Sequence, residues 1–327
     1  MRILRRACIA CLTVLASCRN ATRPGYAFVS NEMSHTVSVV DLSVNAVVAT
    51  IPIVGRPRGI QRSPDGKTVY VTSSDDQPGR EGSADGIVAI EVATRRVKTM
   101  YHIGTDPEQF AVTPDGAFLY ASNEDGGTAT AIDARTGTFV ATLVVGIEPE
   151  GVAISPDGRW AVVTSETSNS VSVIDTHTNT VVQNILVDLR PRAVAFTPDG
   201  SRLFVTSEVG GSVTAIDGRS FAVLKTIPLE GGEGKPMGVA VSPDGARVYV
   251  ANGRTNTVSV LDAATYRVVS TIPVGKRPWG VTISRDGRRV YTADGMTNSI
   301  SVIDVAQAKV VATITVGERP WGIALVP

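Results

Sequence analysis

The sequence predicts an all-β fold, a seven-bladed β-propeller with four antiparallel strands in each blade, from a repeat and from the strand pattern inside it. Each repeat contains an Asp-Gly turn and four short apolar strands, and no stretch of ten residues shows helical periodicity. The period is 42 residues, interrupted by insertions at 75–85 and 229–235. The turn recurs as PDG or RDG, with its aspartate at Asp65, Asp115, Asp157, Asp199, Asp244 and Asp286.

The repeat at 277–317 shows the expected strands. Its apolar segments are GVTIS (280–284), RVYTA (289–293), SISVID (299–304) and KVVATITV (309–316), and the Asp-Gly turn joins the first two as a tight hairpin. Residues alternate between polar and apolar in SISVID, as in a strand with one buried face. The alternation blurs in VVATI, so we expect the fourth strand to be covered on both faces.

The two ends of the repeat region are incomplete in a complementary way. Full units begin near residues 56, 105, 147, 189, 235 and 276, which gives six blades. Residues 26–55 carry only the last three strands of a unit, and residues 322–326 supply a first strand. An open ring would leave strand edges unpaired, so we expect both ends of 26–327 to build the seventh blade together.

The first residues read as an export signal. A basic start (MRILRR) and a short apolar run make 1–17 a signal peptide. The word LASC at 15–18 looks like a lipobox, which predicts lipidation of Cys18, a tether over 18–25 and membrane contact through the lipid anchor only. An ordinary cleaved signal with a chance cysteine is the alternative. We expect a periplasmic location, at the outer membrane because Arg19 is not an aspartate.

Composition argues against several functions. The 31 basic and 31 acidic residues balance, so we expect no nucleic-acid partner. We also expect a monomer. His35, His102 and His177 fall at different repeat positions, and all three cysteines lie in the signal or at its cut. No hydrolase, nucleotide or zinc motif is present, so the sequence predicts no enzyme, no catalytic residues, no metal and no cofactor.

The repeat words carry a resemblance. RVYVANGRTNTVSVLD (247–262) and LFVTSEVGGSVTAID (203–217) resemble the YVTN β-propeller repeat. More narrowly, GTDPEQFAVTPDG, VGIEPEGVAISPDGRWAVVTSETSNSVSVIDT and VQNILVDLRPRAVAFTPDG resemble the PQQ-dependent catabolism-associated β-propeller proteins. The resemblance to the YVTN repeat covers 26–327. The narrower resemblance implies a periplasmic or envelope protein associated with quinoprotein alcohol oxidation, whose partner is a periplasmic quinoprotein dehydrogenase or its cytochrome. It transfers no catalytic residues.

A first candidate ring lies at the entrance of the channel. The residue after the proline that enters each inner strand differs from blade to blade, and in a propeller such variable positions carry function. We expect a charged half facing an apolar half, with Trp321 able to stack on Arg58. The ring consists of Arg58, Glu108, Glu150, Arg192, Met237, Trp279 and Trp321.

A second ring follows the second strand of each blade, and we expect it at the same end of the channel. It would make the mouth electronegative, with Arg58 and Arg192 as counter-ions, and Ca²⁺ is an alternative occupant. It contains five acids and two glycines: Glu32, Asp75, Glu124, Glu166, Glu208, Gly253 and Gly295.

Together these features predict a non-enzymatic module that binds a flat polyanionic aromatic ligand or a protein in periplasmic quinoprotein-linked oxidation. One alternative is a lactonase-like hydrolase that uses Glu150 with Arg192 at the mouth. Another is an envelope scaffold without a small ligand. If the prolyl loops only pack blade against blade, the same charges form ordinary ion pairs.

Overall fold

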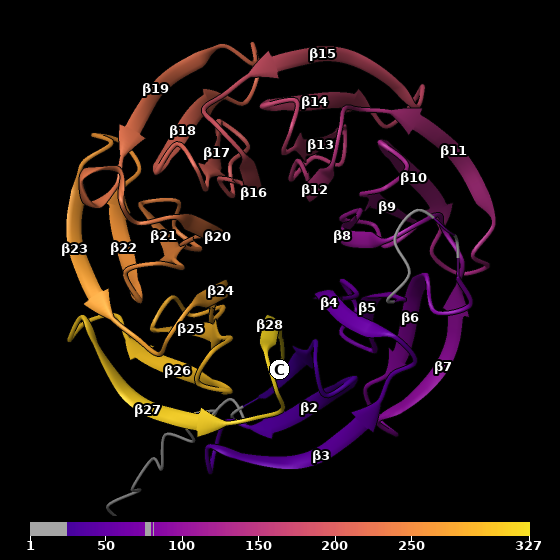
Figure 1. The fold of residues 1–327 in the computed structure, drawn as a ribbon, viewed down its shortest axis with the longest axis horizontal. Helices are drawn as coiled ribbons and strands as arrows, with labels where there is room; N and C mark the ends of the chain where they lie inside the picture. Colours follow the sequence, from indigo (N-terminus) through magenta and orange to yellow (C-terminus); the bar gives the residue numbers. More distant parts are fainter. Residues whose placement is uncertain (1–24, 76–79, 81) are drawn as a thin grey trace, which may run out of the picture.

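The computed structural model describes residues 25–75, 80 and 82–327, and the strands in them form seven four-stranded antiparallel sheets. Figure 1 shows these sheets as blades arranged in a ring around a central axis. The predicted seven-bladed propeller is confirmed. A short 3₁₀ turn, η1 (Glu230–Gly232), lies in the second predicted insertion. The described part of the chain has no helix that is long and apolar enough to span a membrane. The predicted signal peptide and Cys18 lie outside the described residues.

Each blade runs from an inner strand near the axis to an outer strand at the rim (Figure 1). Blade 1 contains β28 (Pro320–Val326), β1 (Tyr26–Asn31), β2 (Thr36–Asp41) and β3 (Ala46–Pro52). Blade 2 contains β4 (Arg56–Arg62), β5 (Thr68–Ser74), β6 (Gly86–Glu91) and β7 (Arg96–Tyr101). Blade 3 contains β8 (Pro107–Val112), β9 (Phe118–Asn123), β10 (Thr128–Asp133) and β11 (Phe139–Val144).

The remaining blades repeat this order. Blade 4 contains β12 (Pro149–Ile154), β13 (Trp160–Ser165), β14 (Ser170–Asp175) and β15 (Thr180–Leu186). Blade 5 contains β16 (Pro191–Phe196), β17 (Arg202–Ser207), β18 (Ser212–Asp217) and β19 (Val223–Pro228). Blade 6 contains β20 (Pro236–Val241), β21 (Arg247–Asn252), β22 (Thr257–Asp262) and β23 (Val268–Pro273). Blade 7 contains β24 (Pro278–Ile283), β25 (Arg289–Asp294), β26 (Ser299–Asp304) and β27 (Lys309–Thr315).

Blade 1 closes the ring as the sequence predicts. Its inner strand β28 pairs antiparallel with β1, so that Val29 lies opposite Ile323. The Ser30 hydroxyl accepts a hydrogen bond from the Gly322 amide at 3.0 Å and donates one to the Arg58 carbonyl of blade 2 at 2.6 Å. The closing strand is therefore joined to its own blade and, through Ser30, to the next one.

Seven hydrophobic clusters hold the ring together, and each is formed by two neighbouring blades. Between blades 1 and 2, for example, Phe28 and Val39 pack with Val69, Val71 and Ile90. Because each blade buries its faces only against its two neighbours, stability should depend on every interface around the ring.

The outer strands differ from the prediction. In β27, Lys309, Val311 and Thr313 are exposed, and only Ile314 is fully buried. The expectation that VVATI is covered on both faces was wrong. The physical reason is geometric: blades diverge toward the rim, where the neighbour no longer covers them. In the outer strands, the blurred apolar pattern thus reflects partial burial by the neighbouring blade and not burial of both faces.

The repeated turn aspartates act locally. The Asp65 carboxylate accepts hydrogen bonds from the Ser63 hydroxyl at 2.6 Å and the Lys67 amide at 3.0 Å, and these bonds lower its pKa. The same geometry lowers the pKa of Asp199 to about 2. These six aspartates fix one hairpin in each of blades 2–7, so they are set aside as candidates for a unique site.

Candidate functional site at the mouth of the ring

Two sets of loops meet at one end of the ring, here called the mouth. One set leads into the inner strands, and the other follows the second strands. In blade 4 the Glu166 amide donates to the Glu148 carbonyl at 2.8 Å, and in blade 7 the Gly295 amide donates to the Arg277 carbonyl at 2.9 Å. Equivalent bonds occur in blades 1, 3, 5 and 6. Both predicted rings therefore lie at the same end, as expected.

On one side of the mouth, carboxylates surround two buried arginines. We call this the acidic side. Arg58 lies in contact with Glu108, and its nitrogens lie 3.1 Å from Glu32, 3.5 Å from Asp106 and 3.9 Å from Glu124. Its side chain is only 12% exposed. Arg58 is therefore the counter-ion that the sequence suggested, but it is shared among four carboxylates.

The second arginine of the acidic side is Arg192. It lies 2.8 Å from Glu150 and 3.9 Å from Glu208, and it contacts Glu166 directly. Arg190 adds a second cation near Glu166 and Glu208. Glu150 and Glu166 are almost fully buried, so Arg192 mainly compensates charges inside the protein. The predicted pair of Glu150 with Arg192 exists, but Glu150 is only 3% exposed and offers little surface to a substrate.

Glu124 has a different environment. Its side chain is 26% exposed, and burial together with the nearby charges of Glu150 and Asp106 raises its pKa to about 7, although Arg58 and Arg192 act in the opposite direction. Burial also raises the pKa of Glu150, against the opposing charge of Arg192. Glu124 is thus a carboxyl at the surface of the mouth that exchanges a proton near neutral pH.

The carboxylate oxygens of Asp106, Glu108 and Glu124 lie within 4.8 Å of one another, a spacing that a cation would accept. The guanidinium of Arg58, however, contacts all three. Burial opposes the charged form of Arg58, but Asp106 and Glu32 raise its pKa, so it remains a cation. An arginine therefore occupies the position that a metal ion would need, and we assign no metal to these acids.

On the other side of the mouth, the predicted apolar residues gather around a pair of indoles. Trp279 and Trp321 are stacked, with ring centroids 6.2 Å apart and an interplanar angle of 22°. Arg277 and Arg192 lie 4.9 and 5.3 Å from the Trp279 centroid. The expected partnership of Trp321 with Arg58 is not what forms, because the second indole covers Trp321 instead. Met237 is buried nearby against Gly253.

The sequence analysis missed a third ring. The residue immediately before the proline that opens each inner strand is charged in all seven blades, and six of the seven have a left-handed backbone, with φ of 44–57°. The signal was visible in the sequence, one position before the residues chosen. These residues are Arg56, Asp106, Glu148, Arg190, Lys235, Arg277 and Arg319.

This third ring makes the indole side basic. We call it the basic side and define it by Lys235, Arg254, Arg277, Arg319 and the two stacked indoles. Among the described residues, Lys235, Arg277 and Arg319 form no ion pair, while Arg254 reaches the exposed Glu233 at 3.0 Å. The sequence predicted an electronegative mouth, and this holds only for the acidic side. The whole mouth is polarised.

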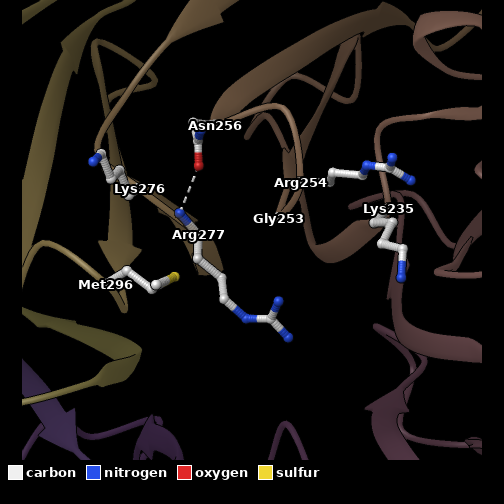
Figure 2. Close-up of a pocket in the computed structure, with 7 residues that line it drawn as sticks. All are labelled: Lys235, Gly253, Arg254, Asn256, Lys276, Arg277 and Met296. Carbon is white, nitrogen blue, oxygen red and sulfur yellow. Dashed lines mark hydrogen bonds between the residues drawn. The ribbon is translucent and has the colours of Figure 1, made fainter.

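Two adjoining pockets open on the basic side. The larger has a volume of about 520 Å³ and lies between blades 6 and 7, and the smaller, of about 210 Å³, is bounded by Trp279. Both share Arg277 and Met296. In Figure 2 the guanidinium of Arg277 extends toward the side on which Lys235 lies, whereas Lys276 and Arg254 point away from it.

Comparisons with known proteins agree with this architecture. The chain is a β-propeller protein. Residues 232–326 match the model of the YNCE-like beta-propeller, and residues 21–145 match the model of the Lactonase, 7-bladed beta-propeller. A curated relative, Antigen Lp49 of Leptospira interrogans, is 31% identical over 102 residues, which span 29% of this chain and 22% of that protein.

Solved structures show the same fold. A chain of hydrazine synthase from Kuenenia stuttgartiensis superposes with a TM-score of 0.77 at 23% identity, covering 90% of this chain and 99% of the other. A proposed 6-phosphogluconolactonase from Bacteroides fragilis gives 0.75 at 17% identity, covering 94% and 99%. At these identities the likeness concerns the fold alone.

These matches correct one prediction. The sequence predicted no enzyme, and the match of 21–145 to the lactonase model contradicts it. The matched segment includes Arg58, Glu108 and Glu124 of the acidic side. The reason for the error is that residues brought together from separate blades, such as Arg58 and Glu124, leave no contiguous motif in the sequence. The narrower resemblance to PQQ-associated propellers stays a prediction.

Proposed function

We propose that the chain is a hydrolase that opens a ring ester at the acidic side of the mouth. The observation that carries the proposal is Glu124, a partly exposed carboxyl whose pKa of about 7 places it between base and acid at neutral pH. It lies beside the buried cation Arg58. The match of 21–145 to the lactonase model supports the same reaction class.

The chemistry follows from these two groups. The Glu124 carboxylate takes a proton from a water molecule, and the water oxygen forms a bond to the lactone carbonyl carbon. Negative charge then develops on the carbonyl oxygen, and the Arg58 guanidinium offsets it. When the ring C–O bond breaks, the protonated Glu124 returns its proton to the leaving oxygen. The product is a hydroxy acid, and Glu124 is regenerated.

Glu124 fits this role better than Glu150, which the sequence suggested. Glu150 is held at 2.8 Å by Arg192 and is only 3% exposed. A general base has to approach the proton it abstracts to within hydrogen-bond distance. Glu150 instead contributes charge, since it is one of the groups that raise the pKa of Glu124.

The test is a pH-stat assay over five- and six-membered sugar lactones, with and without a phosphate group. Wild-type activity should rise with pH through an apparent pKa of about 7, because the base form of Glu124 is required. Glu124→Gln should lose about a hundredfold or more of kcat/KM. Asp125→Asn, an equal charge change on the adjacent residue, should keep activity. No turnover of any lactone, or full activity of Glu124→Gln, would refute the proposal.

A second candidate function is protein binding in periplasmic quinoprotein-linked oxidation, which the sequence resemblance suggests. One observation favours it: apolar side chains are exposed at the mouth end of blades 3, 4 and 5, beside the acidic side. Val144 is 81% and Leu186 77% exposed, and both end outer strands. Ile147, Leu189 and Val209 lie exposed on the loops next to them. Exposed apolar groups on adjacent loops are typical of interaction surfaces.

This second function has its own test. A purified quinoprotein alcohol dehydrogenase, and separately its cytochrome, would be titrated calorimetrically against the chain. The double variant Ile147→Asp, Leu189→Asp should abolish binding, whereas Val311→Asp at the rim of blade 7 should not. If the two variants bind with equal heat, or if neither the dehydrogenase nor the cytochrome binds, this second function is refuted.

Export of the chain and a lipid on Cys18 are proposed as well. Palmitate labelling that survives Cys18→Ser would exclude the lipid.

A further inference from the structure

The basic side of the mouth contains cations without partners inside the described protein. Lys235, Arg277 and Arg319 occupy the same position on three consecutive blades, 6, 7 and 1, and none forms an ion pair among the described residues. On the acidic side the same position holds Arg190, which is paired with Glu166 and Glu208. Cations brought together without internal counter-ions are a favourable site for an external anion.

The second ring explains why Lys235 and Arg277 stay unpaired. In the blade of Arg319 the acid, Glu32, pairs with Arg58 instead. After the second strand, five blades carry an acid, but blades 6 and 7 carry Gly253 and Gly295. A Cβ at Gly295 would lie 2.8 Å from Cδ1 of Trp279, so glycine is needed for the indole to lie where it does. Glycine in place of an acid at this position therefore removes a counter-ion and leaves room for the Trp279 indole.

Arg277 joins the two pockets. It lines both the space of about 520 Å³ and the space of about 210 Å³, and the second is bounded by Trp279 and Arg319. Its amide donates to the Asn256 side chain at 2.8 Å, as drawn in Figure 2, while its guanidinium forms no ion pair among the described residues and lies 4.9 Å from the Trp279 centroid. Lys235 lies across from it on blade 6, whereas the Arg254 side chain runs away from it (Figure 2) toward Glu233.

We propose that this basic side is a binding site for a planar aromatic anion, in which Arg277 and Lys235 bind a phosphate or carboxylate group and the Trp279 indole stacks on the ring. The site adjoins the acidic side through Arg192, but it uses neither Glu124 nor Arg58, which carry the proposed hydrolysis. It needs no turnover, so the two proposals can fail independently. Arginine suits both anions because its planar fork can donate two parallel hydrogen bonds.

The experiment uses four probes and tryptophan fluorescence. 1-Naphthyl phosphate and 1-naphthoate are planar anions, 1-naphthol is the neutral control, and inorganic phosphate is the anion without a ring. The Trp160→Phe background leaves Trp279 and Trp321 as reporters. Both planar anions should quench the fluorescence and bind more weakly as salt increases. The tighter of the two identifies the preferred anionic group.

Variants locate the site. Arg277→Gln should weaken the planar anions by about ten- to a hundredfold, the loss expected for charge-assisted hydrogen bonds. Trp279→Leu should weaken them without changing the affinity for inorganic phosphate, and Trp279→Phe should restore part of the loss. Arg219→Gln, an equal charge change in an exposed turn of blade 5, is the control. Equal binding of 1-naphthol, equal binding of inorganic phosphate, or wild-type affinity in Arg277→Gln would overturn the proposal.

Discussion

The two sides of the mouth use the same backbone positions in opposite ways. On the acidic side, Arg58 and Arg192 each contact several carboxylates, so most of the charge is balanced inside the protein. On the basic side, Lys235, Arg277 and Arg319 form no ion pair with any described residue and lie next to two indoles. In blades 6 and 7 the difference depends on one position, where an acid is replaced by glycine, and in blade 1 it depends on Glu32, which pairs with Arg58 rather than with Arg319. A fold that repeats its backbone can thus assign distinct chemistry to each blade.

The largest effect we predict comes from deleting the strand that closes the ring. Deleting residues 318–327 removes β28, which carries Trp321 and pairs with β1. The loss opens the ring and exposes the blade faces buried by Phe28 and Ile323. Typical domains are stable by only about 5–15 kcal/mol, so we expect no cooperative unfolding transition in thermal circular dichroism. Removal of Pro327 alone is the control. A deletion variant that still melts cooperatively would mean that the ring does not need this strand.

The next prediction compares one arginine from each side. Arg192→Ala leaves the buried carboxylate of Glu150 without its paired cation, while Glu166 keeps Arg190, and it should cost about 3–5 kcal/mol in the free energy of unfolding at pH 7. Arg277→Ala loses only its contact with Trp279 and should cost less than about 1 kcal/mol. Urea denaturation measures both.

The same pair has a pH signature. Because the pKa of Glu150 is raised, its carboxyl takes up a proton more readily than an ordinary glutamate once Arg192 is removed. The destabilisation by Arg192→Ala should therefore be smaller at pH 5 than at pH 7. Equal costs for the two variants, at both pH values, would contradict the view that only the acidic side is internally compensated.

Most of the fold could be predicted from the sequence, because the same strand pattern recurs around the ring. The Asp-Gly turns, the strand order and the shared blade 1 all follow from a period of 42 residues, and the structure has each of them. The exposure of the outer strands did not follow. Whether VVATI is covered depends on how far neighbouring blades diverge, and no residue in the segment records that distance.

The site was predictable in part. The repeat aligns equivalent residues, so Arg58, Glu32 and Glu124 could be placed at one end before their distances were known. The pKa of Glu124 could not be predicted, since it depends on burial and on Glu150 of the next blade. The basic side was missed because Arg277 lies one residue before the tryptophan-bearing position that drew attention.

A third prediction concerns Asp294, a buried acid on the basic side. Equivalent positions hold Asn31, Asn123 and Asn252, whose amides donate to hydroxyls on the next strand. Burial raises the pKa of Asp294 to about 6, although the Ser301 and Thr292 hydroxyls donate to it. The native state therefore holds a proton that the unfolded chain has already released between about pH 4 and pH 6, and stability falls as the pH rises through that range.

Asp294→Asn should remove this penalty. At pH 7 we expect the variant to be more stable than the wild type by about 1–3 kcal/mol, the range that a shift of about two pKa units permits. The difference should shrink as the pH falls toward about 3, where the wild-type carboxyl is protonated in both states. Urea denaturation across this range is the measurement. A variant that is less stable at pH 7 would show that a cation nearby compensates the carboxylate after all.

The smallest effect tests the glycine that separates the two sides. Gly295→Ala places a Cβ 2.8 Å from the present position of Cδ1 of Trp279, so the indole has to rotate away from Trp321. The cost in the free energy of unfolding should be modest, about 1 kcal/mol, because a side chain moves and the backbone does not. The near-ultraviolet circular dichroism of the stacked indoles should fall. Gly253→Ala, which meets only the flexible Met237 at 3.1 Å, should leave that signal intact. If both alanine variants leave the indole signal unchanged, the glycines do not determine where the two indoles lie. The positions of the indoles would then depend on the inner strands that carry them.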